Sequence, residues 1–183
     1  MIHRRNLIMG GAAALAAGSL SSPADAKSAR QIDVESQAAL QTLFSTRPDA
    51  RTISNRSLGV LIIPEIIKAG LILGGTYGEG KLIIGGQTNS YWSYAAASLG
   101  FQAGAQKASQ ALFFLNQTAL NTFKNGDGIE VGADAEVTII DQGAEVDVSK
   151  IQDTTPIVAY VFGQQGLLGG VSLQGGKYSR IAR

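Results

Sequence analysis

Hydrophobic positions recur near the spacing of a helix over residues 30–46. Ile32, Ala39 and Leu43 fall on one side of this predicted helix, and most of the residues between them are polar. Such an arrangement is typical of an amphipathic helix that covers a core with its apolar side. Pro48 ends the helix because proline lacks the backbone N–H donor. The sequence therefore predicts an N-terminal helix that lies against the rest of the domain.

Two shorter helices are also predicted. Pro48 can begin a second helix that extends through Arg56, since proline is well tolerated in the first helical turn. A third helix is predicted over residues 118–124, where Leu120 and Phe123 share one side. Residues that can cap its two ends are Asn116 or Thr118 at the start and Asn125 with Gly126 at the end.

Past Gly59 the chain changes to short apolar runs rich in β-branched residues, which are typical of strands. These runs are residues 58–63, 69–73, 81–84, 111–115 and 157–162. The first two are expected to be joined by a turn over residues 64–68. The intervals are too short for crossover helices, which favours antiparallel pairing. We expect an α+β fold: N-terminal helices packed on a curved, Gly-rich antiparallel β-sheet or partial barrel, with one further helix between strands.

The first 26 residues have the pattern of a cleaved export signal. Arg4 and Arg5 precede an apolar run over residues 7–17, and small residues lead to the sequence Ala-Asp-Ala at 24–26. The paired arginines favour the twin-arginine route over the general secretory one. The apolar run is too short to cross a bilayer. We therefore predict a signal over residues 1–26, a single mature domain over residues 27–183, and a periplasmic location.

Composition removes several classes of chemistry. The chain has no Cys, and its one His, His3, lies in the predicted signal. The mature chain would then lack a thiol, an imidazole and a lipid-attachment cysteine, so we expect neither a His-based or Cys-based active site nor a lipoprotein. The whole chain carries a formal charge of +1. Removal of two arginines and one aspartate with the signal makes the mature chain neutral, which argues against a nucleic-acid partner.

Charge is nevertheless uneven along the mature chain. Residues 27–124 hold nine basic and five acidic residues, whereas residues 127–153 hold eight acidic residues and one lysine. The acidic run is expected to be a solvated edge. A pair of its carboxylates in a cleft would instead suggest a glycoside hydrolase, which we rank last. The basic bias before it can present a positive face to anionic partners.

Three further motifs have mainly structural interpretations. Residues 75–81 match G-x-x-x-x-G-K, but Leu82 replaces the Ser or Thr of a P-loop and a strand pattern follows, so we predict a tight hairpin and no nucleotide. Residues 98–106 place Gly and Gln on one side of a predicted strand, a flat surface for close packing or, less favoured, a ligand. At least two of Tyr91, Trp92 and Tyr94 are expected in the core.

Several of these runs together resemble the SYLF-domain family. They are LGVLIIP at 58–64, KAG at 68–70, GGTYGEG at 74–80, SLGFQAGAQ at 98–106, TAL at 118–120 with Phe123, VFG at 161–163 and GL at 166–167. The resemblance implies a non-enzymatic lipid-binding domain, of the type that regulates actin in yeast relatives. This chain departs from the eukaryotic pattern because it has no additional interaction domain and its first helix also carries acids.

The resulting hypothesis is binding of anionic phospholipid at the bacterial cell envelope, with no cofactor and no metal. Basic side chains would contact lipid phosphates, and apolar side chains nearby would insert at the interface. The candidate residues are Arg47, Arg51, Arg56 and Lys68 for the phosphates, and Ile66 and Ile67 for insertion. The alternative is an envelope scaffold that binds another protein through the Gly/Gln strand or by strand addition to an open sheet edge.

Overall fold

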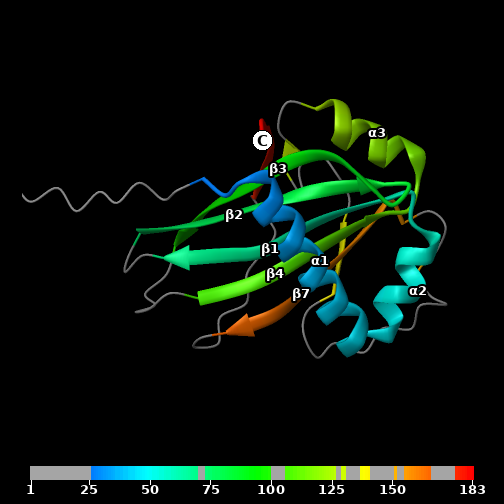
Figure 1. The fold of residues 1–183 in the computed structure, drawn as a ribbon, viewed down its shortest axis with the longest axis horizontal. Coiled ribbons are helices and arrows are strands. Elements are labelled where there is room, and N and C mark those ends of the chain that lie inside the picture. Colours follow the sequence, from blue (N-terminus) through cyan, green and yellow to red (C-terminus); the bar gives the residue numbers. More distant parts are fainter. Residues whose placement is uncertain are drawn as a thin grey trace, which may run out of the picture.

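The computed structural model describes residues 26–69, 73–99, 106–126, 129–130, 137–140, 151, 155–165 and 176–183. Helices α1 (Ala29–Thr46) and α2 (Pro48–Arg56) precede the sheet, and α3 (Gln117–Asn125) lies between strands. The strands are β1 (Gly59–Ala69), β2 (Leu73–Ile84), β3 (Gln87–Leu99), β4 (Gln106–Phe114), β5 (Ile129–Glu130), β6 (Val137–Ile140), β7 (Ile157–Gln165) and β8 (Lys177–Ile181). The three predicted helices are confirmed, and Figure 1 shows α1 lying across the strands.

All eight strands belong to one sheet, in the order β5-β8-β3-β2-β1-β4-β7-β6. The described strands form one sheet that is not closed into a barrel, which confirms the predicted α+β fold with N-terminal helices on a sheet. Six of the strand pairs are antiparallel, as expected, whereas β6 pairs with β7 in parallel. The sheet is therefore mixed, and the prediction of a purely antiparallel sheet is wrong at this edge.

Each face of the sheet carries its own apolar core. On one face, Leu43 of α1 and Ile53 of α2 pack against the apolar side chains that β1, β4 and β7 project on that face. On the other face, Leu120 and Phe123 of α3 pack against Trp92 and other aromatic residues. Asn116 caps α3 by accepting a hydrogen bond from the backbone N–H of Ala119, as predicted. Trp92 and Tyr94 are fully buried, which confirms the core role expected for two of the three aromatics.

Strand β1 runs without a turn through residues 64–68, so the predicted turn there is wrong. The chain instead accommodates Pro64 at a β-bulge, where the register of β1 against both neighbours shifts. Proline has no N–H to give to a ladder and is tolerated in a sheet at such bulges. Ser109 of β4 donates a hydrogen bond to the Pro64 carbonyl oxygen over 2.7 Å and so secures the bulge.

Two glycines of the P-loop-like motif, Gly78 and Gly80, lie inside β2 and face this bulge. A Cβ added at Gly78 would lie 2.6 Å from the Glu65 carbonyl oxygen, and one at Gly80 would overlap the Ile62 carbonyl. Close approach of two backbones therefore explains Gly78 and Gly80, and the hairpin predicted for this motif is wrong because β2 continues through it. The tight turn comes just after it, at Gly85 and Gly86, which join β2 to β3 with positive φ angles of 58° and 77°.

Several sequence predictions fall outside the described residues. The export signal up to residue 25, residues 100–105 of the Gly/Gln strand and all the acids of the 127–153 run except Glu130 belong to this group. Within the described residues, no helix has both the length and the apolar character that a membrane crossing requires.

Candidate functional site

A hollow of about 410 Å³ opens over the sheet beyond the start of α1. It lies on the face that α1 covers, where the ends of β1 and β2 extend past the helix. The side chains that line it include Lys27, Glu65, Ile67, Tyr77, Glu79 and Arg183. We call it the β1–β2 hollow. Its volume is within the range of small-molecule and headgroup sites, and the side chains around it combine both signs of charge with apolar groups.

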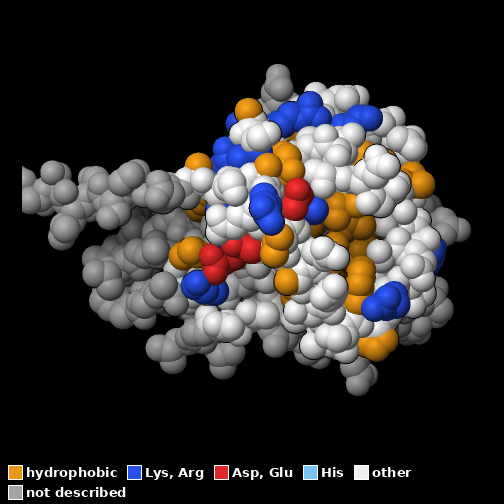
Figure 2. Space-filling view, viewed as in Figure 1, with side chains coloured by type: hydrophobic (Ala, Val, Ile, Leu, Met, Phe, Trp, Pro, Cys, Tyr) orange, Lys and Arg blue, Asp and Glu red, His pale blue; other side chains and the backbone are white. Residues whose placement is uncertain are grey.

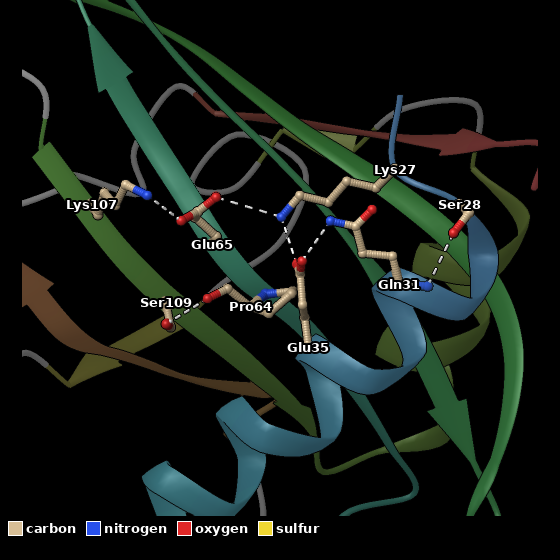
Figure 3. Close-up of polar contacts among 8 residues, drawn as sticks. All are labelled: Lys27, Ser28, Gln31, Glu35, Pro64, Glu65, Lys107 and Ser109. Atoms are coloured by element: carbon tan, nitrogen blue, oxygen red, sulfur yellow. Dashed lines mark hydrogen bonds and ion pairs between the residues drawn. The ribbon is translucent and has the colours of Figure 1, made fainter. Parts of the chain in front are cut away.

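A chain of ion pairs crosses one side of the hollow. The Nζ of Lys107 lies 2.6 Å from Glu65 Oε2, and the Nζ of Lys27 lies 3.5 Å from Glu65 Oε1 and 2.6 Å from Glu35 Oε2 (Figure 3). Gln31 donates a further hydrogen bond to Glu35. Figure 2 shows the acidic and basic side chains side by side over β1 and β4. The network fixes the start of α1 to β1 and β4.

The lysines around Glu65 favour its charged form. The hydrogen bond from Lys107 is the main cause, and the positive charge of Lys27 adds to it, so the pKa of Glu65 falls below its usual value despite partial burial. Glu65 is therefore ionised at neutral pH. Three cations and three carboxylates lie in and around the hollow, which leaves it with no net formal charge. They are Lys27, Lys107 and Arg183, and Glu35, Glu65 and Glu79.

The opposite wall holds a buried carboxylate. Glu79 of β2 is only 4% exposed, and its Oε1 accepts hydrogen bonds from the Tyr77 hydroxyl over 2.7 Å and from the Arg183 guanidinium over 2.5 Å. Within the described part of the chain, Glu79 Oε2 is buried and has no hydrogen-bond partner. Burial and the hydrogen bond to Glu79 raise the pKa of Tyr77 to about 12, so this hydroxyl is a permanent donor near neutral pH.

Apolar and basic groups form the rim of the hollow. Ile67 lies directly opposite Tyr77 on β2 and opposite Lys107 on β4. Cross-strand neighbours project on the same face, so the three side chains are adjacent. Ile67 is 39% exposed and Tyr77 50% exposed, although both are large and apolar in part. We call these three residues the rim. It is the point where an exposed apolar pair meets an exposed cation.

A comparison with protein-family models gives one match. Residues 95–181 match the model described as "Ysc84: Las17-binding protein actin regulator". The matched stretch is therefore similar to the Ysc84 family. This is the SYLF-domain family of the resemblance, which is therefore confirmed, and it is a family of binding domains rather than a known family of enzymes. No curated protein matches the chain.

The Ysc84 match covers just under half of the chain. It contains the end of β3 and all of β4, α3, β7 and β8. Most of the β1–β2 hollow comes from outside this stretch: of its rim, only Lys107 lies within the Ysc84 match. The runs of the resemblance at residues 58–80 also precede the match.

The structure separates the predicted lipid-contact residues into two groups. Arg47, Arg51 and Arg56 lie at α2, near the start of β1, whereas Ile67 and Lys68 lie near its other end (Figure 1). Nine residues of a strand at about 3.3 Å each separate the two groups by roughly 30 Å. The sequence predicts a turn over residues 64–68, between the two groups, but β1 continues through these residues without a turn. The two groups are therefore not one site.

Contacts within each group further limit which of the predicted residues are available to contact lipid. Arg47 pairs with Asp49 over 2.7 Å, and its guanidinium lies over the Tyr160 ring, while that of Arg51 lies over the Phe44 ring. Ile66 is fully buried in the core, because alternation along the strand places it opposite to Ile67. Ile66 is therefore not available for insertion, and Ile67 is the member of the pair that reaches the surface.

Sequence reasoning missed most of the hollow. Glu79 is a lone acid in a Gly-rich strand, and this is the one local signal that could have drawn attention to it. Its partner Arg183 is 104 residues away in the sequence. Among the described residues, no group of three acids, histidines or cysteines is placed to hold a metal ion. The arrangement offers recognition through charge, hydrogen bonds and apolar contact.

Proposed function

We propose that this protein is a non-enzymatic binding module that associates with anionic phospholipid at the cell envelope. The family match supports a binding role, and the export pattern of residues 1–26 supports the location. The observation that carries the proposal is the rim: two partly exposed apolar side chains, Ile67 and Tyr77, stand beside the exposed cation Lys107 on an uncovered part of the sheet. A membrane surface offers both phosphates for a cation and apolar chains for such side chains.

Each group at the rim has a physical counterpart in a lipid interface. Ile67 gains free energy when its exposed surface leaves water. Tyr77 has an apolar ring with a polar end, a combination that is enriched at the headgroup level of membranes. A basic group near an anionic surface contributes about 1 kcal/mol, so Lys107 strengthens binding about fivefold but does not suffice alone. Lys68, the next residue of β1, projects on the opposite face of the sheet, so it adds positive charge at this end but is not part of the rim.

The cations of α2 have a secondary place in this proposal. Arg51 and Arg56 project from a helix roughly 30 Å from the rim along β1. A flat membrane in contact with the rim would not contact α2 to the same extent. We therefore assign lipid contact first to the rim, and we give Lys68 and the arginines of α2 a role in longer-range attraction to a negative surface.

The test is co-sedimentation with vesicles of phosphatidylglycerol in phosphatidylcholine, and with phosphatidylcholine alone, at low and high salt. We expect binding to the anionic vesicles that weakens with salt. Ile67→Ser and Lys107→Ala should each reduce it severalfold. Leu58→Ser is a matched control, because Leu58 is 42% exposed but precedes β1 at the opposite end of the sheet. Absent or salt-insensitive binding, or an equal loss in the control, would reject the proposal.

The alternative is a scaffold role in which the sheet binds another protein. The family description names a protein partner, Las17, for the family. In this chain, β6 ends the described strand order and its Ile139 is 37% exposed, so a partner strand could extend the sheet there. A pull-down that yields one stoichiometric protein partner, together with no vesicle binding, would favour this alternative.

A further inference from the structure

We propose that the β1–β2 hollow binds a primary ammonium group linked to a phosphate, the chemistry of an aminophospholipid headgroup. This inference rests on the proposed lipid function and specifies it, since it names the headgroup at the same site. The shared chemistry has two sources, a phosphatidylethanolamine in a membrane or a free phosphoethanolamine-type molecule. Both present an N–H donor a few ångströms from a phosphate.

The ammonium end is assigned to Glu79. Its carboxylate is buried, and one oxygen already accepts two hydrogen bonds while the other has no partner in the described part of the chain. A buried acceptor without a partner is costly, and a donor that enters recovers that free energy. A primary ammonium supplies both the N–H donor and the positive charge. A quaternary ammonium supplies the charge alone, which predicts selection between them.

The phosphate end is assigned to Lys27. Its ammonium has three N–H donors, and its contacts with Glu35 and Glu65 use two of them. The third can reach a phosphate in the hollow that Lys27 lines. Cations and carboxylates are equal in number here, so a zwitterionic ligand suits the hollow better than one that carries a single sign of charge.

Arg183 is the group that must yield to the ligand. It follows β8, lies in no strand or helix, and donates a hydrogen bond from its guanidinium to Glu79 Oε1. In the proposed complex this side chain shifts and the ammonium takes its place beside the carboxylate, while the Tyr77 hydroxyl continues to hold Oε1 in place. The rim then lies where the acyl chains of a bound lipid would begin. Arg183 therefore competes with the ligand, and removal of its side chain is expected to strengthen binding.

The first experiment is calorimetric titration of the full chain with phosphoethanolamine and with phosphocholine. We expect phosphoethanolamine to bind at least tenfold more tightly. Glu79→Gln should abolish this preference, whereas Arg183→Ala should preserve or increase it. A purely structural ion pair between the two residues would instead make both variants bind less. Equal binding of the two ligands, or no binding of either, overturns the proposal.

The second experiment separates the two sources and the proposed function. Vesicles of phosphatidylcholine receive either phosphatidylethanolamine or phosphatidylglycerol, and co-sedimentation is compared for the wild type and Glu79→Gln. A gain from phosphatidylethanolamine that the variant loses supports a lipid headgroup at the site. Calorimetric selectivity without that gain supports a free phosphoamine. Binding to phosphatidylglycerol reports on the proposed function alone, because that lipid lacks an amine.

Discussion

Gly78→Ala is the sharpest test of how β2 lies against the bulge of β1. Its added Cβ would lie 2.6 Å from the Glu65 carbonyl oxygen, 2.7 Å from Ile63 Cγ2 and 3.1 Å from Ile66 Cγ1. Ordinary contact begins near 3.4 Å, so a backbone carbonyl would have to move by about 0.8 Å. Because backbone cannot rotate away as a flexible side chain can, we expect a loss of about 1–3 kcal/mol in unfolding free energy.

Gly75→Ala is the matched control in the same strand. Gly75 is exposed, and a Cβ there meets nothing within 4 Å. Its substitution should change the stability by less than about 0.5 kcal/mol, or increase it slightly, because alanine loses less backbone freedom on folding.

Urea unfolding followed by the fluorescence of the single tryptophan measures both variants. Trp92 is fully buried and its ring lies 4.4 Å from that of Phe123, so its emission reports on the packed sheet. A loss of 2 kcal/mol would also lower the Tm by roughly 4–8 °C in a chain of this size. Equal stabilities of Gly78→Ala and Gly75→Ala would refute the close approach of β1 and β2 at the bulge.

Three further predictions concern charge and capping. Folding lowers the pKa of Glu65 below its usual 4.5, so the charged carboxylate stabilises the fold above about pH 4.5. The stability advantage of the wild type over Glu65→Gln should therefore shrink as the pH falls below that value. Urea unfolding at pH 7 and at pH 3 measures this change. Asp49→Asn should lower the free energy of unfolding by about 1–3 kcal/mol, because Asp49 pairs with the partly buried Arg47 and accepts a hydrogen bond from the Tyr160 hydroxyl. Asp33→Asn, at a side chain that is 40% exposed, should lower it by less than about 1 kcal/mol. Equal denaturation midpoints of the two variants would contradict this prediction. Asn116→Ala should cost about 1 kcal/mol through loss of the α3 cap, measured by thermal unfolding, and an unchanged Tm would count against the cap.

The helices were predictable because local rules decide them. Periodic apolar positions, Pro48 in the first turn of α2 and the Asn116 cap of α3 all act within a few residues of one another. Strand β1 was harder. Pro64 signals an interruption, but whether it makes a turn or a bulge depends on the neighbouring strands, and the hydrogen bond from Ser109 comes from a position 45 residues away.

The candidate site was predictable only in part. Ile67 and Lys68 were named from the sequence as lipid contacts, and the structure places Ile67 at the rim and Lys68 beside it in β1. Ile66 was named with them because a predicted turn has no fixed alternation, whereas a strand places adjacent residues on opposite faces. The pair of Glu79 and Arg183 depends on β8 joining β3 at the edge of the sheet, which local patterns do not reveal.

The proposed function requires the rim of the β1–β2 hollow to meet an anionic lipid surface. Its most direct measurement is the salt-dependent partition of the wild type, Ile67→Ser and Leu58→Ser into phosphatidylglycerol-containing vesicles. We expect strong partition for the wild type and for Leu58→Ser, and a severalfold loss for Ile67→Ser alone. The same partition for all three proteins, or none for the wild type, would contradict it.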